Sequence, residues 1–186
     1  NHFFFFLQLV SGNPKLKVLT KPSQLIIVQN AWSVAFSRSG GGLSSISFFD
    51  REYLSGNFMP SFFRAATNSD RSDKSFVLAA TIFSQETDWR TIQAGLSYHR
   101  FTYEMIQDTF VLVVFYKNHA FKEDVMVQYT MEPSGKLSLE VVFTPRYDLL
   151  RGGFRVKMNR AVNKLIWYGR GIHESYPDRK ESARLG

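Results

Sequence analysis

Short apolar segments with a period of two residues constrain the fold of this chain more than any other feature. Apolar residues alternate with polar or small ones along residues 32–37, 125–129, 137–143 and 154–158. The second and third of these segments are separated by residues 132–135, which contain proline and glycine. A period of two places every second side chain on one face of a strand, whereas helical spacing is rare along this chain. The sequence therefore predicts an all-β, antiparallel fold of the sandwich or barrel type.

The turns between these segments predict which strands pair. A glycine triplet at residues 40–42 lies between two strand-like segments, 32–37 and 43–48, and predicts a hairpin. The proline-containing turn at 132–135 predicts a second hairpin in the same way. Residues 110–116 are apolar at every position, which favours a strand that is buried on both faces. One or two helical turns are expected only within residues 76–83.

The composition fits one globular domain without cysteine chemistry. Hydrophobic residues make up 44% of the 186 residues and aromatic residues 16%, so a sizeable core can form. The absence of cysteine excludes disulfides and thiolate sites, and it favours a cytoplasmic protein, with the periplasm as the alternative. A net charge of +7 raises nucleic acid or a membrane surface as partners. Because the basic residues are spread among apolar strands, we expect neither partner.

Near the C-terminus an apolar segment leads into a loop rich in charged residues. Residues 169–180 read Gly-Arg-Gly-Ile-His-Glu-Ser-Tyr-Pro-Asp-Arg-Lys. The two glycines permit unusual backbone angles and the proline fixes one φ, so a rigid loop that carries a polar site is expected. The segment resembles the G-R-G-P-x-E-N-Y-x-D-R-K motif of the LacZ-type β-galactosidases of glycoside hydrolase family 2. Ile172 and Ser175 replace the usual Pro and Asn of that motif.

Two further segments resemble motifs of the same family, in the same order along the chain. Residues 60–70 read Pro-Ser-Phe-Phe-Arg-Ala-Ala-Thr-Asn-Ser-Asp and are similar to P-x-F-W-R-A-P-T-D-N-D. Trp89, followed by Ala-Gly-Leu at 94–96, is similar to W-x-x-A-G-L with a longer gap. On these three motifs the chain is identified as a member of the β-galactosidase small-chain family, from roughly residue 16 onward.

The resemblance implies a fold, a domain division and a role. The fold would be an antiparallel β-sandwich of the galactose-mutarotase-like supersandwich type, incomplete in this chain. Residues 1–12 would be the end strand of a preceding sandwich domain, and residues 13–186 the N-terminal part of the small-chain domain. The apolar first segment lacks the basic start and the cleavage site of a signal peptide, and it is too short to span a membrane.

The whole enzyme would hydrolyse terminal β-D-galactosides such as lactose, and the resemblance places both catalytic glutamates outside this chain. We therefore assign no catalytic residue and expect this segment alone to be inactive. Magnesium and sodium would be bound elsewhere in the full enzyme, so no metal or other cofactor is expected here. The expected partners are the rest of the β-galactosidase chain or a large subunit, the galactoside substrate, and further copies in an oligomer.

The residues expected near the substrate, or in the loops that shape its pocket, fall into two groups. The polar cluster that follows residues 60–63 is either one edge of the sugar site or an Asx-rich turn. By the resemblance, residues 71–88 would form a mobile loop beside the active site. The carboxylates of 169–180 are expected to brace neighbouring arginines and not to act as a retaining pair. The expected site residues are Arg64, Asn68, Asp70, Arg71, Trp89, Arg170, His173, Glu174, Tyr176, Asp178 and Arg179.

Two other functions remain open from the sequence. A stand-alone carbohydrate-binding module of mutarotase-like fold would bind sugar without a partner, and a nucleic-acid-binding domain would lose affinity steeply with salt. The histidines lack the spacing of a zinc site, and His99 and His119 are expected at strand ends or on the surface. Trp32 and Trp167 lie in apolar alternation and are expected in the core.

Overall fold

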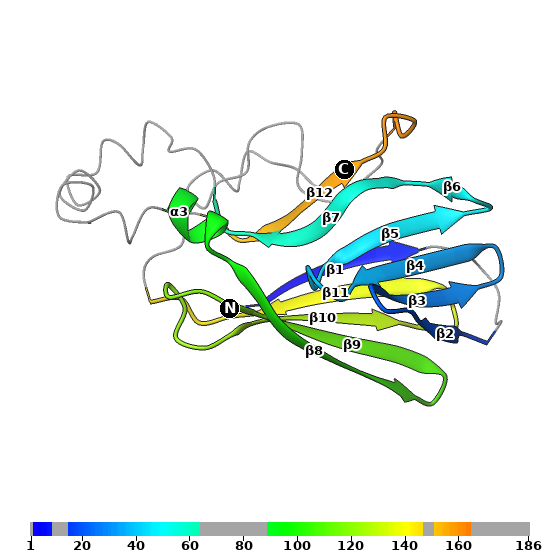
Figure 1. Cartoon of the computed structure of the whole chain (residues 1–186), viewed down its shortest axis with the longest axis horizontal. Helices are drawn as coiled ribbons and strands as arrows, with labels where there is room; N and C mark the ends of the chain where they lie inside the picture. Colours follow the sequence, from blue (N-terminus) through cyan, green and yellow to red (C-terminus); the bar gives the residue numbers. More distant parts are fainter. Residues whose placement is uncertain (1, 9–14, 64–88, 147–150, 165–186) are drawn as a thin grey trace, which may run out of the picture.

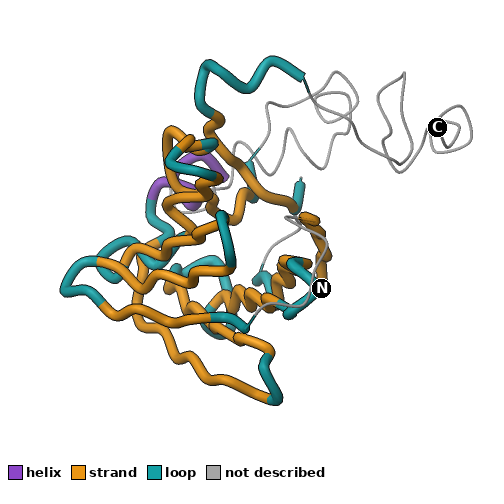
Figure 2. The backbone as a smooth tube through the Cα atoms, turned by 90° about the vertical axis from the view of Figure 1, so that its right-hand side faces the viewer, coloured by secondary structure: helices purple, strands orange, loops and turns teal. Residues whose placement is uncertain are grey.

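In the part of the chain that the structure describes, two antiparallel β-sheets stack face to face (Figure 1). The computed structural model describes residues 2–8, 15–63, 89–146 and 151–164. Within these ranges a single short helix, purple in Figure 2, lies at one end of the sandwich (Figure 1). The predicted all-β, antiparallel sandwich is confirmed.

The first sheet has five strands in the order β1-β11-β10-β9-β8. The strands are β1 (His2–Gln8), β8 (Ser97–Ile106), β9 (Thr109–Lys117), β10 (Val125–Met131) and β11 (Lys136–Val142). The segment 2–8 is thus a strand, and it pairs with β11. The domain division after residue 12 stays a prediction.

The second sheet has seven strands in the order β12-β7-β5-β4-β3-β2, with β6 paired to β5 beside this path. The strands are β2 (Lys17–Thr20), β3 (Gln24–Gln29), β4 (Trp32–Ser37), β5 (Leu43–Phe48), β6 (Arg51–Glu52), β7 (Leu54–Ser61) and β12 (Gly153–Met158). The chain builds β2 to β7, then strands β8 to β11 of the other sheet, and returns to pair β12 with β7. This return places segments about a hundred residues apart in sequence side by side (Figure 1).

The core lies between the sheets and follows the alternation of the sequence. Strands β9, β10 and β11 bury every second side chain. Phe36 of β4 contacts Tyr129 and Phe110 of the opposite sheet, with ring centroids 4.9 and 6.2 Å away. Burying a side chain of this size contributes about 1.5–3 kcal/mol, so a few such contacts between the sheets fix how they stack.

The β4–β5 turn presses directly on the other sheet. Gly41 has a φ of 71°, and a Cβ added there would lie 2.2 Å from Cδ2 of Tyr98 and 2.9 Å from Cγ1 of Val114. Only glycine combines this backbone angle with so close an approach. The glycine triplet therefore makes the predicted hairpin and also lets the two sheets meet.

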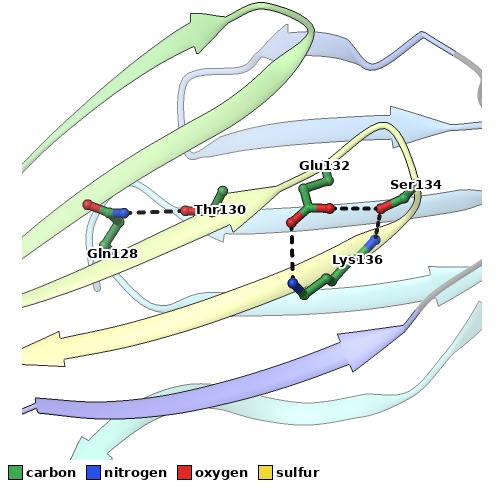
Figure 3. Close-up of polar contacts among 5 residues, drawn as sticks. All are labelled: Gln128, Thr130, Glu132, Ser134 and Lys136. Carbon is green, nitrogen blue, oxygen red and sulfur yellow. Dashed lines mark hydrogen bonds and ion pairs between the residues drawn. The ribbon is translucent and has the colours of Figure 1, made fainter.

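The β10–β11 turn is held by its own side chains and by the opposite sheet. The Glu132 carboxylate accepts a hydrogen bond from Ser134 Oγ at 3.1 Å and pairs with Lys136 Nζ at 3.4 Å (Figure 3). From β3, the buried Gln29 donates through Nε2 to the Pro133 carbonyl at 2.6 Å. This contact ties the turn to the second sheet.

The structure confirms both predicted hairpins and corrects one strand. Segments 32–37 and 43–48 pair, as do the strands on either side of residues 132–135, and 153–158 is a strand. The prediction that 110–116 is buried on both faces is wrong, because Val111, Val113 and Phe115 are half-buried on the outer face of the first sheet. In a two-layer sandwich only the inner face of a sheet is covered by the other sheet.

The helices were also predicted imperfectly. The helix α3 (Trp89–Ala94) was not predicted, since six residues are too few to display a helical period. The helical turns expected within 76–83 lie outside the described residues.

Candidate functional site

Two of the three sequence motifs meet at one end of the sandwich. We call the motif junction the contact between residues 60–63, where β7 ends, and residues 89–96, which contain α3. Gln93 of α3 accepts a hydrogen bond from the Phe62 N–H at 2.7 Å and donates through Nε2 to the Pro60 carbonyl at 3.2 Å. One amide side chain thus replaces a strand partner for both backbone groups, and it fixes the helix at the end of β7.

The junction is also anchored to the other sheet. Asn118, directly after β9, donates through Nδ2 to the Ile92 carbonyl at 2.8 Å and accepts from the Ala120 N–H at 2.9 Å. The Phe62 ring lies 4.8 Å from that of Phe121 and 5.1 Å from that of Phe143. Because Phe121 lies in the connection between β9 and β10 and Phe143 follows β11, this cluster joins the junction to the end of the first sheet.

The outer side of the junction carries a cation. The Arg90 guanidinium lies over the Phe63 ring at 5.5 Å from its centroid. A contact of this kind contributes about 0.5–1 kcal/mol at an exposed site. It adds a third link between the two motifs.

The junction is the base of the segment 64–88. Its described neighbours on both sides, Phe63 and the helix α3, are held together by the contacts above. Four of the expected site residues, Arg64, Asn68, Asp70 and Arg71, lie in this segment and outside the described residues. Trp89 is the first residue of α3, and its side chain is not described.

The third motif follows β12, which runs antiparallel to β7. Gly153 pairs with Ser61 near the junction, and Met158 pairs with Leu54 at the other end of β7. The Asn159 N–H then donates to the Tyr53 carbonyl at 2.8 Å. The remaining expected site residues, Arg170, His173, Glu174, Tyr176, Asp178 and Arg179, lie outside the described residues, as does Trp167.

The described side chains supply braces and no reactive cluster. Glu52 accepts hydrogen bonds from Ser45 Oγ and from the N–H groups of Ile46 and Leu54, at 3.1 and 2.8 Å for the last two. Its carboxylate therefore holds β5 to the start of β7. Within the described ranges no group of three or more His, Asp or Glu side chains is placed to hold a metal ion.

Two tyrosines buried in the core of the sandwich stay protonated at neutral pH. Burial raises the pKa of Tyr116 and of Tyr129 above the ordinary value of a phenol. The Tyr116 hydroxyl donates to Met59 Sδ at 3.7 Å, one residue before the junction. These groups pack and do not titrate near neutral pH.

The predicted surface positions of His99 and His119 are confirmed, as is the predicted packing of Trp32 against the core. His99 and His119 are exposed, the first in β8 and the second just after β9. Trp32 is half-buried against the core, with its ring 4.6 Å from that of Phe48 and 5.9 Å from that of Tyr53. In the part of the chain that the structure describes, no helix has the length and apolar character to cross a membrane.

Sequence reasoning missed the two amides that build the junction. Gln93 and Asn118 each bond to backbone groups far away in the sequence. For Asn118 a signal existed, because an Asn directly after a strand commonly starts an Asx turn. For Gln93 there was none, since its partners lie about thirty residues away along the chain.

The fold and the junction define a class of protein, an antiparallel β-sandwich domain in which side-chain amides tie the end of β7 to the helix α3. A model of the family described as "Beta galactosidase small chain" matches residues 28–186. The chain belongs to this β-galactosidase small-chain family.

Individual relatives agree with this assignment. A β-galactosidase of Priestia megaterium (strain DSM 319 / IMG 1521) is 28% identical over 180 residues, which cover 94% of this chain and 16% of that protein. A β-galactosidase of Clostridium acetobutylicum is 23% identical over 182 residues, covering 95% and 19%. One from Lactobacillus delbrueckii subsp. bulgaricus is 27% identical over 162 residues, covering 84% and 15%. The chain thus spans 15% to 19% of the length of these relatives.

Similarity to a solved structure is low. The solution structure of cyanobacterial PsbP (CyanoP) from Synechocystis sp. PCC 6803 gives a TM-score of 0.24 at 13% identity, over 73% of this chain and 83% of that one.

Proposed function

We propose that this chain is a non-catalytic portion of a β-galactosidase, which shapes one wall of the substrate pocket of the enzyme. The whole enzyme hydrolyses terminal β-D-galactosides such as lactose, in the cytoplasm as the lack of cysteine suggests. The family membership and the naming of the relatives support the activity. The rest of the enzyme supplies the catalytic carboxylates and the metal ions.

The motif junction is the observation that supports the proposed pocket-shaping role. A loop contributes to a pocket only if its base is held in one place by a rigid scaffold. Here Gln93 and Asn118 tie the base of the segment 64–88 to the end of β7 and to the segment after β9. The proposal is therefore that residues 64–88 are presented from this base to the substrate side of the assembled enzyme.

The braces among the described residues support the non-catalytic part of the proposal. A retaining glycosidase needs two carboxylates about 5–5.5 Å apart, one of which acts as a general acid. Glu52 and Glu132 instead use their oxygens to hold strands and a turn of the sandwich. Their chemistry is that of hydrogen-bond acceptors within the fold.

The test is hydrolysis of a chromogenic β-galactoside by this chain alone, and by its mixture with a β-galactosidase large fragment that lacks this region. We expect no hydrolysis by the chain alone and hydrolysis in the mixture. The variant Gln93→Ala, which breaks the junction, should restore less activity than Gln128→Ala, a control on the outer face of β10. Hydrolysis by the chain alone would overturn the non-catalytic role, and sugar binding by the isolated chain without complementation would favour a carbohydrate-binding module.

A further inference from the structure

Strand β8 is the edge of the first sheet, and its core-facing side is poorly covered. Among the described strands it pairs with β9 alone. Phe101, Tyr103 and Met105 stand opposite buried residues of β9, yet Tyr103 and Met105 are 44% and 45% exposed. Figure 1 shows β8 as the outermost strand of its sheet. A long edge with exposed apolar side chains favours pairing with another strand.

The turn that joins β8 to β9 determines which backbone groups of β8 point toward the open edge. The two-residue turn at 107–108 has φ values of 45° and 66°, as in a type I′ hairpin. In such a hairpin the flanking Ile106 and Thr109 bond to each other, and the bonded pairs then alternate along the ladder. The alternate residues from Met105 back to Phe101 therefore turn their N–H and C=O groups away from β9, toward the open edge.

The outward face of β8 carries two opposite charges on either side of Thr102. Arg100 and Glu104 are both exposed and each lies two residues from Thr102, so they point to the same face of the sheet. The Arg100 guanidinium lies over the Phe115 ring at 3.7 Å from its centroid, which keeps it on that face. An antiparallel copy of the same strand centred on Thr102 would place each arginine opposite a glutamate.

We propose that two copies of this chain associate by antiparallel pairing of β8 with β8 of the second copy, centred on Thr102. Arg100 of each copy then lies opposite Glu104 of the other, and Phe101 lies opposite Tyr103. The N–H and C=O groups of Phe101 and Tyr103 both point toward the open edge. The register that pairs the charges therefore also allows these two residues to form backbone hydrogen bonds between the copies. The apolar side chains of the core-facing side become neighbours across the contact.

The charges select both the register and the kind of partner. A pairing centred on Tyr103 instead would place Arg100 opposite Ile106 and Thr102 opposite Glu104, with no charge pair. A foreign strand with charges of one sign would attract one of the two residues and repel the other, since like charges directly opposite are destabilising. A second copy of β8 satisfies both charges at once.

The contact closes on itself. A two-fold interface uses the same patch on both copies, so the pairing stops at two copies and consumes the open edge. The β-bulge between Tyr98 and Arg100 ends the regular ladder on one side, and the turn at 107–108 ends it on the other. Because the pairing is symmetric about Thr102, its regular part is therefore confined to residues 100–104.

The test measures the association of the chain by sedimentation equilibrium with charge-swapped variants. The parent chain should form a concentration-dependent dimer. Arg100→Glu and Glu104→Arg should each weaken it by about tenfold or more, because each change converts two attractive cross-strand pairs into repulsive ones. The double variant R100E/E104R should dimerise like the parent.

Mixing the two single variants gives the sharpest outcome. One variant carries only negative charge at these positions and the other only positive charge, so the mixture should form a heterodimer as tightly as the parent forms its dimer. Lys117→Glu reverses the charge of an exposed residue of β9 outside the contact and should leave the dimer unchanged. Equal melting temperatures would show that all variants fold. A monomeric parent, single variants that dimerise normally, or a mixture that stays monomeric would each overturn the proposal. No sugar or enzyme partner is involved, so the result stands apart from the proposed function.

Discussion

Replacing Gln93 by alanine tests whether the motif junction holds the end of the sandwich. The substitution removes the acceptor of the Phe62 N–H at 2.7 Å and the donor to the Pro60 carbonyl at 3.2 Å. Phe62 is fully buried, so its N–H is left without a partner. Such a group costs about 1–3 kcal/mol, and the second hydrogen bond adds about 0.5–1.5 kcal/mol.

Two effects reduce this loss. Alanine favours a helix over glutamine by a few tenths of a kcal/mol. Gln93 is only half-buried, so water can reach the Pro60 carbonyl once the side chain is gone. We therefore expect a loss of about 2 kcal/mol in the free energy of unfolding, which corresponds to a drop of about 4–8 °C in melting temperature for a domain of this size.

The assay is equilibrium unfolding in urea, combined with hydrogen exchange of the Phe62 amide. Gln128→Ala is the matched control, because its Nε2 makes one long hydrogen bond of 3.4 Å to Thr130 on the outer face. This control should change the free energy of unfolding by less than about 0.5 kcal/mol. If Gln93→Ala matches the control and the Phe62 amide keeps its protection, the clamp contributes nothing and the reasoning fails.

Two further predictions concern the contact between the sheets and the buried phenols. Gly41→Ala should cost more than about 2 kcal/mol, because its Cβ would lie 2.2 Å from Tyr98 Cδ2 at a φ of 71°; Gly40→Ala, whose Cβ would meet only flexible side chains, should cost much less in the same urea titration. Burial raises the pKa of Tyr116 and Tyr129, so on raising the pH the unfolded chain loses these protons before the folded chain does. The contribution of the two phenols to the free energy of unfolding is therefore fully present below about pH 10 and is lost above it. The expected slope is about 1.4 kcal/mol per pH unit for each tyrosine, and stability measured above pH 10 should fall less steeply in the variant with phenylalanine at both positions.

The sequence could predict the sandwich because its strands bury one face. Alternation at 32–37 and at 125–143 translates directly into inner and outer side chains, and the glycine and proline turns mark the hairpins. The error at 110–116 has a physical origin. The apolar Val111, Val113 and Phe115 lie on the outer face, where β-branched and aromatic residues also favour strand geometry, so an apolar run does not by itself imply two-sided burial.

The junction could not be predicted, for a different reason. Its contacts join Phe62 to Gln93 and Ile92 to Asn118, and neither pair has a periodic signal in the sequence. The motifs at 60–70 and 89–96 resembled those of the family but contained no information about their distance in space. That they meet follows only from the path of β7, α3 and β9.

The packing of the sandwich favours its rim as the place of the proposed pocket-shaping role. Between the sheets, the space lined by Leu25, Phe36 and Leu112 has no room for a water molecule. A sugar has no room in this space, so under the proposed function we expect the substrate contacts of the chain to come from segments at the ends of the sandwich. Such segments need a base that does not yield when substrate binds. At the end of the sandwich that carries α3, the aromatic cluster around Phe62 and the amide clamps of Gln93 and Asn118 provide that base.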